Sequence, residues 1–216
     1  MQKSEFQDII SKQDNQKLIQ AIENDSDLVN QLTPHGVSFL TFAAYCGNNE
    51  AVKIISECKK ELDFFESVIT DNINAIKSYL KLTPEILNQS STDGFSGLGL
   101  ACFFGLIKSV VLLIDAGADI NQASNNDFKV YPIHSACANS HLEIIELLIS
   151  HGADINVKQQ RGVSPLHSAA HNGNLAIVKL LIENGADKES IMDSGQTPKD
   201  MAREENHVEI VDFLLN

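Results

Sequence analysis

The sequence has few cysteines, few basic residues and no long apolar run. Its four cysteines lie at positions 46, 58, 102 and 137 with no CxxC pair, which argues against a disulfide framework and against a zinc site. The longest apolar runs are far shorter than a membrane span, and the N-terminal residues lack the basic start and apolar stretch of a secretory signal. These features predict a soluble, cytoplasmic protein.

The charge balance is strongly acidic. Lys and Arg number 16 and Asp and Glu number 29, so the net charge is −13. Nucleic acid and anionic membranes are therefore disfavoured as partners, because both are themselves negative. Two interpretations of the charge remain open: it keeps the protein in solution, or it steers a basic partner protein toward it. The 43% hydrophobic content indicates a folded globular chain.

Internal repetition, with a period of about 33 residues, is the strongest signal in the sequence. The run SPLHSAA at 164–170 repeats YPIHSAC at 131–137, and NLAIVKLLIENGAD at 174–187 repeats HLEIIELLISHGAD at 141–154 at the same interval. A further copy at 106–121 precedes these, and GQTPKDMA at 195–202 begins the last one. A period of this length is typical of stacked helix–turn–helix units.

The N-terminal half contains the same repeat in weaker form. Sliding the sequence on itself to place Phe6 on Phe64 also places Gly36 on Gly94 and Ala43 on Ala101. The chain is thus predicted to form about seven units within one domain, since no linker separates them. The units lie near residues 4–35, 36–61, 62–93, 94–126, 127–161, 162–194 and 195–216.

Each unit has residues suited to helix ends and helix packing. Ser164 is expected to be a helix N-cap, followed by Pro165 at the first helical position. In the second helix, Leu142, Ile145 and Leu148 are expected to form one buried stripe. Glycine after the helix supplies a left-handed residue; it stands at Gly117, Gly152 and Gly185.

The run SPLHSAA, followed by GNLAIVKLLI and GAD, closely resembles the ankyrin-repeat consensus. The resemblance is close over residues 93–216 and weaker before them, and the chain looks most similar to short, stand-alone bacterial members. It implies an all-α solenoid in which each unit has two antiparallel helices and a hairpin-like loop. Ankyrin arrays typically bind proteins through the loop tips and first helices.

No catalytic or metal-binding set is recognisable. His134 and His167 occupy the TPLH position, where the resemblance implies hydrogen bonds between repeats rather than acid–base chemistry. His141, His151, His171 and His207 are interpreted as occupying different repeat positions and forming no ligand set. Cys102 and Cys137 are expected to be small buried residues. We therefore expect no enzymatic activity, no cofactor and no metal.

The fourth and fifth units depart from the consensus. Gly97 and Gly99 replace the Pro and His of the motif, so the first helix of that unit is expected to be less firmly capped. Two extra residues between Asn121 and Tyr131 are expected to make that loop protrude. Ser140 replaces the glycine between the helices, a position to which serine is poorly suited.

The candidate binding residues face the concave side or the loop tips, as the resemblance implies. They are aromatic, basic and apolar residues of the kind that anchor interfaces. The set consists of Tyr45, Phe95, Phe103, Phe104, Phe128, Val130, Lys158, Arg161, Val163, His171 and Asn172. An alternative for Phe103 and Phe104 is packing between repeats, against the longer loop.

The sequence therefore predicts a monomeric, non-catalytic module that binds another protein, whose identity it does not specify. One alternative is an inhibitor or regulatory subunit that blocks the active site of an enzyme or toxin. A small-ligand binder or an enzyme is the other alternative, and it would require a convergent set of titratable groups in a pocket.

Overall fold

A computed structural model describes residues 2–215, and within them the chain is all-α, with fourteen α-helices and three short 3-10 helices. The only β-type pairings in this range are two isolated bridges, Leu32 with Ser38 and Ser90 with Ser96. The chain divides into two compact units, residues 1–84 and 85–216. None of the helices in the described range is long and apolar enough to cross a membrane.

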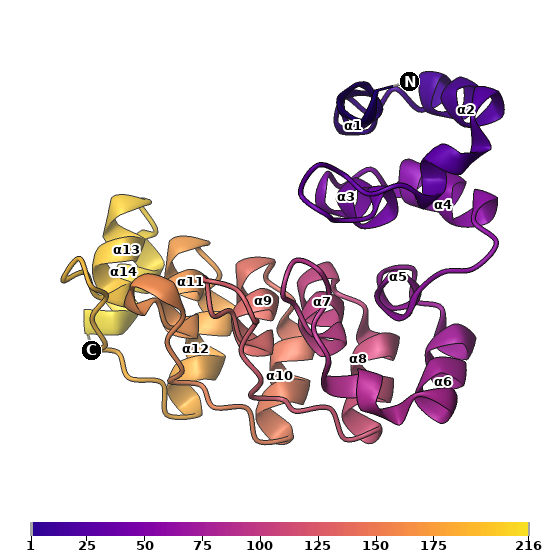
Figure 1. Cartoon of the computed structure of the whole chain (residues 1–216). Coiled ribbons are helices and arrows are strands. Elements are labelled where there is room, and N and C mark those ends of the chain that lie inside the picture. The colour runs from indigo at the N-terminus through magenta and orange to yellow at the C-terminus, as the bar shows by residue number, and fades with distance from the viewer. Residues whose placement is uncertain (1, 216) are drawn as a thin grey trace. The chain divides into compact units, whose positions relative to one another are not determined.

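The first unit is a series of short helices (Figure 1), and its largest fully buried side chains are three phenylalanines among aliphatic residues. The rings of Phe6 and Phe39 are fully buried and meet edge to face at 4.7 Å. Phe64 is also buried. The elements are α1 (Lys3–Ser11), α2 (Asn15–Asn24), η1 (Ser26–Asn30), α3 (Phe39–Tyr45), α4 (Asn49–Cys58), α5 (Phe64–Ile69) and α6 (Ile73–Leu82), and η2 (Pro84–Asn88) spans the boundary between the units.

The second unit stacks its helices in two rows. In Figure 1 the first helix of each repeat packs on the next in the order α7, α9, α11, α13, and the second helices follow as α8, α10, α12, α14. The elements are α7 (Gly97–Phe104), α8 (Ile107–Asp115), α9 (Pro132–Ala138), α10 (Leu142–Ser150), η3 (Gln160–Gly162), α11 (Pro165–His171), α12 (Leu175–Glu183), α13 (Pro198–Glu204) and α14 (Val208–Leu215). The all-α solenoid predicted from the sequence is confirmed; the count of seven repeats and the single domain stay predictions.

The helix starts follow the sequence. Ser164 and Thr197 each accept a hydrogen bond from the third helical amide and precede a proline, as expected. The less firm cap expected on α7 is confirmed: Ser96 accepts from the amide of Gly99 at 3.1 Å, but α7 lacks the reciprocal capping-box bond that α11 and α13 have. The serine alone therefore caps this helix, without the proline and histidine of the motif.

The stripe expected on α10 is partly wrong. Ile145 and Leu148 are fully buried, but Leu142 is 36% exposed and Ile144 takes the buried place instead. The left-handed glycines are confirmed, as at Gly152 with φ 88°. Ser140 also adopts the left-handed region, with φ 58°.

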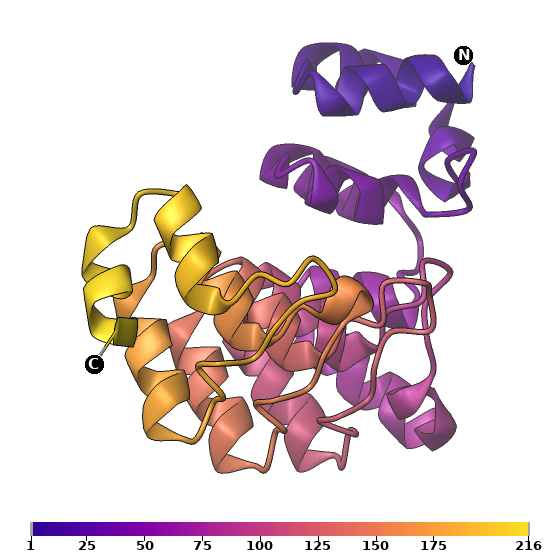
Figure 2. The ribbon, with the colours of Figure 1, turned by 90° about the vertical axis from the view of Figure 1, so that its left-hand side faces the viewer.

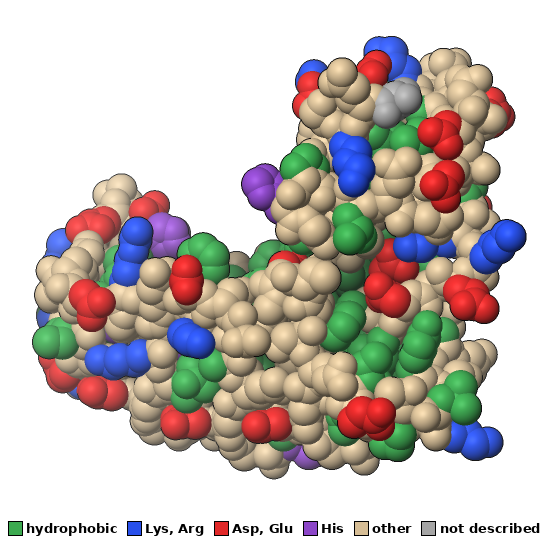
Figure 3. All heavy atoms as spheres, in the orientation of Figure 1, with side chains coloured by type: hydrophobic (Ala, Val, Ile, Leu, Met, Phe, Trp, Pro, Cys, Tyr) green, Lys and Arg blue, Asp and Glu red, His purple; other side chains and the backbone are tan. Residues whose placement is uncertain are grey.

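A chain of asparagines links successive repeats of the second unit. The side-chain oxygens of Asn88, Asn121 and Asn156 each accept from a backbone amide of the following repeat at 2.8 to 2.9 Å. The amide groups of Asn121 and Asn156 donate to the carbonyls of glycines in that same next repeat. The exposed aspartates of the Gly-Ala-Asp turns lie at this edge, and Figure 3 shows acidic side chains spaced along it below α8, α10 and α12.

Candidate protein-binding site

The loop tips of the second unit are joined to one another by backbone hydrogen bonds. The amide of Asn125 donates to the carbonyl of Gly94 at 2.7 Å, and that of Gln160 donates to the carbonyl of Phe128 at 2.8 Å. The amide of Asp193 donates in turn to the carbonyl of Arg161 at 3.0 Å. The loops consequently run side by side as one surface (Figure 2).

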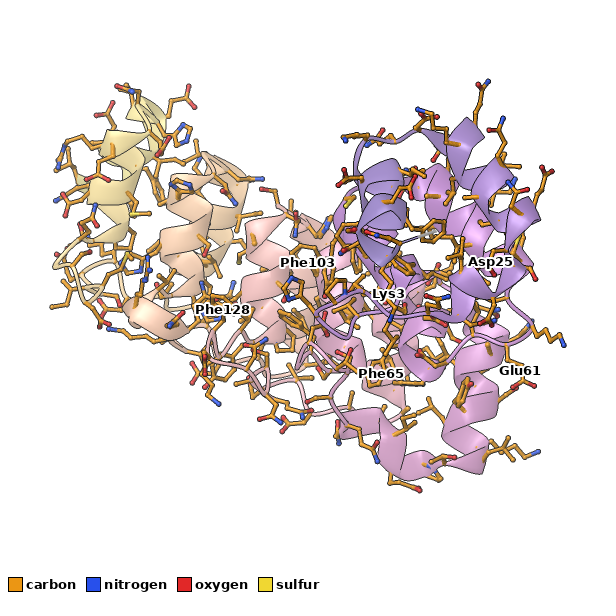
Figure 4. All side chains as sticks on the ribbon, turned by 45° about the horizontal axis from the view of Figure 1, so that its top comes forward. Lys3, Asp25, Glu61, Phe65, Phe103 and Phe128 are labelled. Atoms are coloured by element: carbon orange, nitrogen blue, oxygen red, sulfur yellow. The ribbon has the colours of Figure 1, made fainter. Side chains whose placement is uncertain are left out.

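A groove of about 310 Å³ lies between two of these tips. Its walls are formed by Phe128, Val130, Gln159, Gln160, Arg161 and Val163. Phe128 is 60% exposed and has no aromatic partner within the described part of the chain. Figure 4 labels it on the loop beside η3. Four residues predicted from the sequence thus lie together, and we call this surface the tip groove.

The longer loop before α9 owes its shape to two polar side chains. The hydroxyl of Ser124, which is buried, donates to the Asn126 side-chain oxygen at 2.8 Å and accepts from the amide of Val130 at 2.8 Å. The same Asn126 oxygen accepts from the amide of Phe128, while its amide group donates to the carbonyl of Asp93. The two extra residues therefore fold around a fixed polar centre and leave Phe128 outside.

Two basic tip residues have left-handed backbones. Lys129 has φ 53° and Arg161 has φ 65°. Both are exposed. Lys158, a predicted binding residue, instead donates from its Nζ to the carbonyl of Ile191 at 3.0 Å. Lys158 therefore anchors the following loop, whereas the other two side chains extend toward solvent.

The predicted aromatic residues near α7 are less exposed than Phe128. Phe103 and Phe104 are both half-buried, and their rings meet edge to face at 5.1 Å. Figure 4 shows Phe103 on α7, away from Phe128 on its loop. Phe95 is half-buried as well. Tyr45 lies in the first unit and is 38% exposed. Binding by these residues remains a prediction.

At the end of α11, the two predicted residues have different surroundings. His171 is exposed, and its Nδ1 lies 3.5 Å from a carboxylate oxygen of Glu205. The side-chain amide of Asn172 donates to the carbonyls of Ala138 at 2.9 Å and Cys137 at 3.2 Å. Asn172 therefore holds neighbouring repeats together, a contact that its sequence position did not reveal.

The histidines of the TPLH position join repeats, as predicted. The Nε2 of His134 lies 2.9 Å from the carbonyl oxygen of Val163, and that of His167 lies 3.2 Å from the carbonyl oxygen of Gln196. Burial lowers the pKa of His134 to about 4, and it lowers the pKa of His167 in the same way. Both rings are therefore neutral structural groups at neutral pH.

Two further histidines share a role that the sequence analysis missed. His141 and His207 were assigned different repeat positions, which is wrong: each lies just before a second helix. Their Nε2 atoms lie 3.1 Å and 2.9 Å from the carbonyl oxygens of Phe103 and His171. Each bond joins two successive repeats. The overlooked signal was the spacing of the two histidines, which is twice the repeat period.

Two of the four cysteines lie in the core of the second unit. Cys102 and Cys137 are fully buried, as expected, and burial raises the pKa of both thiols far above its usual value. No group of His, Cys, Asp and Glu side chains there is arranged to hold a metal ion.

The model for three-copy ankyrin repeats matches residues 64–159 and 133–216, which together cover most of the sequence. The chain belongs to the ankyrin-repeat family. The loops that form the tip groove are thus the hairpin-like loops of an ankyrin array. Membership of a short bacterial type stays a prediction.

Several curated ankyrin proteins are similar to this chain. It is 38% identical to mouse protein phosphatase 1 regulatory subunit 27 over 46% of its own length and 63% of that protein. It is 36% identical to the putative ankyrin repeat protein FPV014 of fowlpox virus (strain NVSL), over 65% of the chain and 33% of that protein. Mouse rabankyrin-5 is 35% identical over 35% of the chain, and the chain spans only 6% of that protein.

Sequence reasoning missed three residues of this ankyrin surface. Gln159 and Gln160 line the tip groove, and Lys129 lies between two lining residues. The glutamines carry no repeat-specific signal. Lys129 does, since it stands two positions before the helix N-cap, where Gly94, Gly162 and Gly195 stand in the other loops of this unit.

Proposed function

We propose that this chain is a non-catalytic protein-interaction module that binds a partner protein through its concave face and its loop tips. The observation that carries the proposal is the exposure of Phe128 at the tip groove. A large exposed aromatic side chain in the wall of a preformed groove is typical of an interface anchor. Its loop is held by one backbone hydrogen bond to the preceding loop and one to the next loop, so the ring is presented without further folding.

The ankyrin fold supports this proposal, since ankyrin arrays generally act by binding proteins. The concave positions extend the surface beyond the groove through Phe103, Phe104 and His171, and Tyr45 is the candidate residue of the first unit. The sequence-based expectation of a basic partner concerns the acidic surface as a whole and stays a prediction. We also propose that the chain is monomeric, works in the cytoplasm and needs no cofactor.

A second candidate is a regulatory role toward an enzyme. The name of the mouse relative, a regulatory subunit of protein phosphatase 1, favours it. An array of this kind would act by covering an active site or by positioning a substrate, with the same surface in either case. This candidate would be supported if phosphatase activity is recovered together with the wild-type chain and if adding more of the chain changes that activity.

Site-directed cross-linking tests the interaction module. A photoreactive amino acid is placed at position 128 of the full chain, and a matched variant carries it at position 111, where Val111 is exposed on α8. After irradiation in the native cell, a defined protein adduct from position 128 but not from position 111 is expected. Adducts at both positions or at neither would contradict binding at the tips.

A variant series extends the test to the concave face. Triple replacement of Phe103, Phe104 and His171 by Ala should reduce recovery of the same partner, and Phe128→Ala should do so without lowering the melting temperature. If the triple variant melts lower but keeps the partner, the concave face is structural only. Retention of the partner by Phe128→Ala would remove the groove from the interface.

A further inference from the structure

The tips beside the groove carry free positive charge in an acidic chain. The side chains of Lys129 and Arg161 are exposed and make no hydrogen bond or ion pair within residues 2–215. The chain as a whole has a net charge of −13. Asp127 lies close to Lys129 in sequence, and Asp193 lies in the loop bonded to Arg161, so the positive charge is limited to the tips themselves.

Both cations are held in a backbone conformation that a side chain disfavours. Two positions before the helix N-cap, the other loops of this type place Gly36, Gly94, Gly162 and Gly195, all with φ between 72° and 90°. Lys129 stands at the same place with φ 53°, and Arg161 directly precedes Gly162 with φ 65°. Since glycine adopts this region without steric cost, glycine at position 129 would make the folded chain more stable than lysine does.

The groove, which Arg161 lines and whose residues Phe128 and Val130 flank Lys129 in the sequence, is suited to an apolar side chain. Phe128 forms one wall, and the half-buried Val130 and Val163 form the adjoining surface. The side-chain amides of Gln159 and Gln160 line the same space and make no hydrogen bond to any residue from 2 to 215. An amide can donate and accept at once, as an extended peptide backbone requires of its neighbours.

We infer that the tip groove binds an extended acidic segment of the partner protein, in which a carboxylate side chain adjoins an apolar one. The apolar side chain would lie against Phe128 and the carboxylate would pair with Arg161 and Lys129. A guanidinium matches a carboxylate with two parallel hydrogen bonds. This inference rests on the proposed function, since it names the chemistry of the segment that the interaction module binds.

A peptide segment suits this surface better than nucleic acid or a second copy of the chain. A nucleic acid extends past the tips and would meet the acidic surface around them, so its phosphates would be repelled. A second copy would bring a further charge of −13 against the first. A short acidic segment is small enough to reach the two cations and the groove while Asp127 and Asp193 flank it.

Peptide display on the full-length chain tests the inference. A phage library of random peptides is panned on the wild type, and the recovered sequences are expected to place Asp or Glu beside Leu, Ile or Phe. One such peptide, synthesised with a fluorophore, is then titrated against variants. Lys129→Gly and Arg161→Gly are each expected to weaken its binding about tenfold, because each removes one charge-assisted contact.

The stability of the same variants separates binding from folding. Lys129→Gly is expected to raise the melting temperature, since it relieves the left-handed lysine, while it weakens the peptide. Lys108→Ala, which removes an exposed cation on α8, should leave both properties unchanged. Loss of affinity accompanied by a lower melting temperature would count against a binding role for Lys129.

Several results would overturn the inference. The first is recovery of basic or uncharged peptides, and the second is an affinity of the acidic peptide for both glycine variants that equals its affinity for the wild type. The third is a fluorescent single-stranded oligonucleotide that binds through Arg161 more tightly than the acidic peptide does. The fourth is a concentration-dependent dimer that Arg161→Gly blocks. A protein adduct at position 128 together with any of these would leave the interaction module standing while the acidic segment fails. Without such an adduct, the proposed function fails as well.

Discussion

Replacement of Gly173 by alanine should destabilise the second unit more than a left-handed backbone alone explains. Gly173 follows α11 with φ 74°, and the ring of His207 lies over it. A Cβ atom at this position would lie only 2.4 Å from Cε1 of that ring. The ring would have to move, and its Nε2 would then lose the 2.9 Å contact with the carbonyl oxygen of His171.

The magnitude follows from these two effects. A left-handed alanine costs about 1–2 kcal/mol, and loss of one hydrogen bond between repeats costs about 1 kcal/mol more. Gly173→Ala should therefore lower the free energy of unfolding by about 2–3 kcal/mol. The control is Gly185→Ala in the same unit, because that glycine has φ 92° but no atom within 4 Å of the added Cβ.

The assay is equilibrium unfolding in urea, followed by circular dichroism, for both glycine variants with and without His207→Ala. Once Gly173 is alanine, removal of His207 should cost almost nothing further, because its contact is already lost. Equal destabilisation by Gly173→Ala and Gly185→Ala would refute the reasoning. So would full additivity of Gly173→Ala with His207→Ala.

Three further outcomes are expected. Between pH 8 and pH 5.5, His134 alone should cost the folded chain about 1.4 kcal/mol of stability, because burial lowers its pKa to about 4 and protons bind mainly to the unfolded chain below the ordinary pKa of 6.5. His134→Gln should remove that part of the pH dependence, which calorimetry at both pH values checks. Asn156→Ala should lower the melting temperature more than Asn184→Ala, since only Asn156 bonds to the next repeat. Lys59→Met should cost about 3–5 kcal/mol in chemical unfolding, because it leaves the buried carboxylate of Glu66 without its ion-pair partner. Addition of Glu66→Leu should restore part of the loss, since Glu66 also accepts from the amide of Asp63 in the capping box of α5.

Features set by nearest neighbours along the chain were accessible from the sequence. The caps at Ser164 and Thr197 depend on a hydroxyl placed before a helix, and the turn at Gly152 depends on a missing Cβ; both are local properties of residue type. The role of the TPLH histidines was predicted from the resemblance to the ankyrin consensus, which implies hydrogen bonds between repeats at that position.

Features set by contacts between repeats were accessible only in part. Phe128, Val130, Arg161 and Val163 were predicted as binding residues, but their gathering in one groove depends on the hydrogen bond between two loops. The irregular corner at Ser140 has a comparable explanation. The next repeat there begins its second helix after Asn174 rather than a histidine, so no ring excludes a Cβ. That exclusion follows from three-dimensional stacking, which periodicity alone does not describe.

The hydrogen bonds between loop tips also bear on the speed and strength of association. Fixing the backbone of a flexible loop costs about 1–2 kcal/mol of conformational entropy for each residue. At positions 125, 160 and 193 that cost has been met during folding, because each amide is already bonded to the neighbouring loop. A partner therefore meets a surface whose shape exists before the encounter, and association needs no slow ordering step. Differences in affinity among related partners should then appear mainly in the lifetime of the complex.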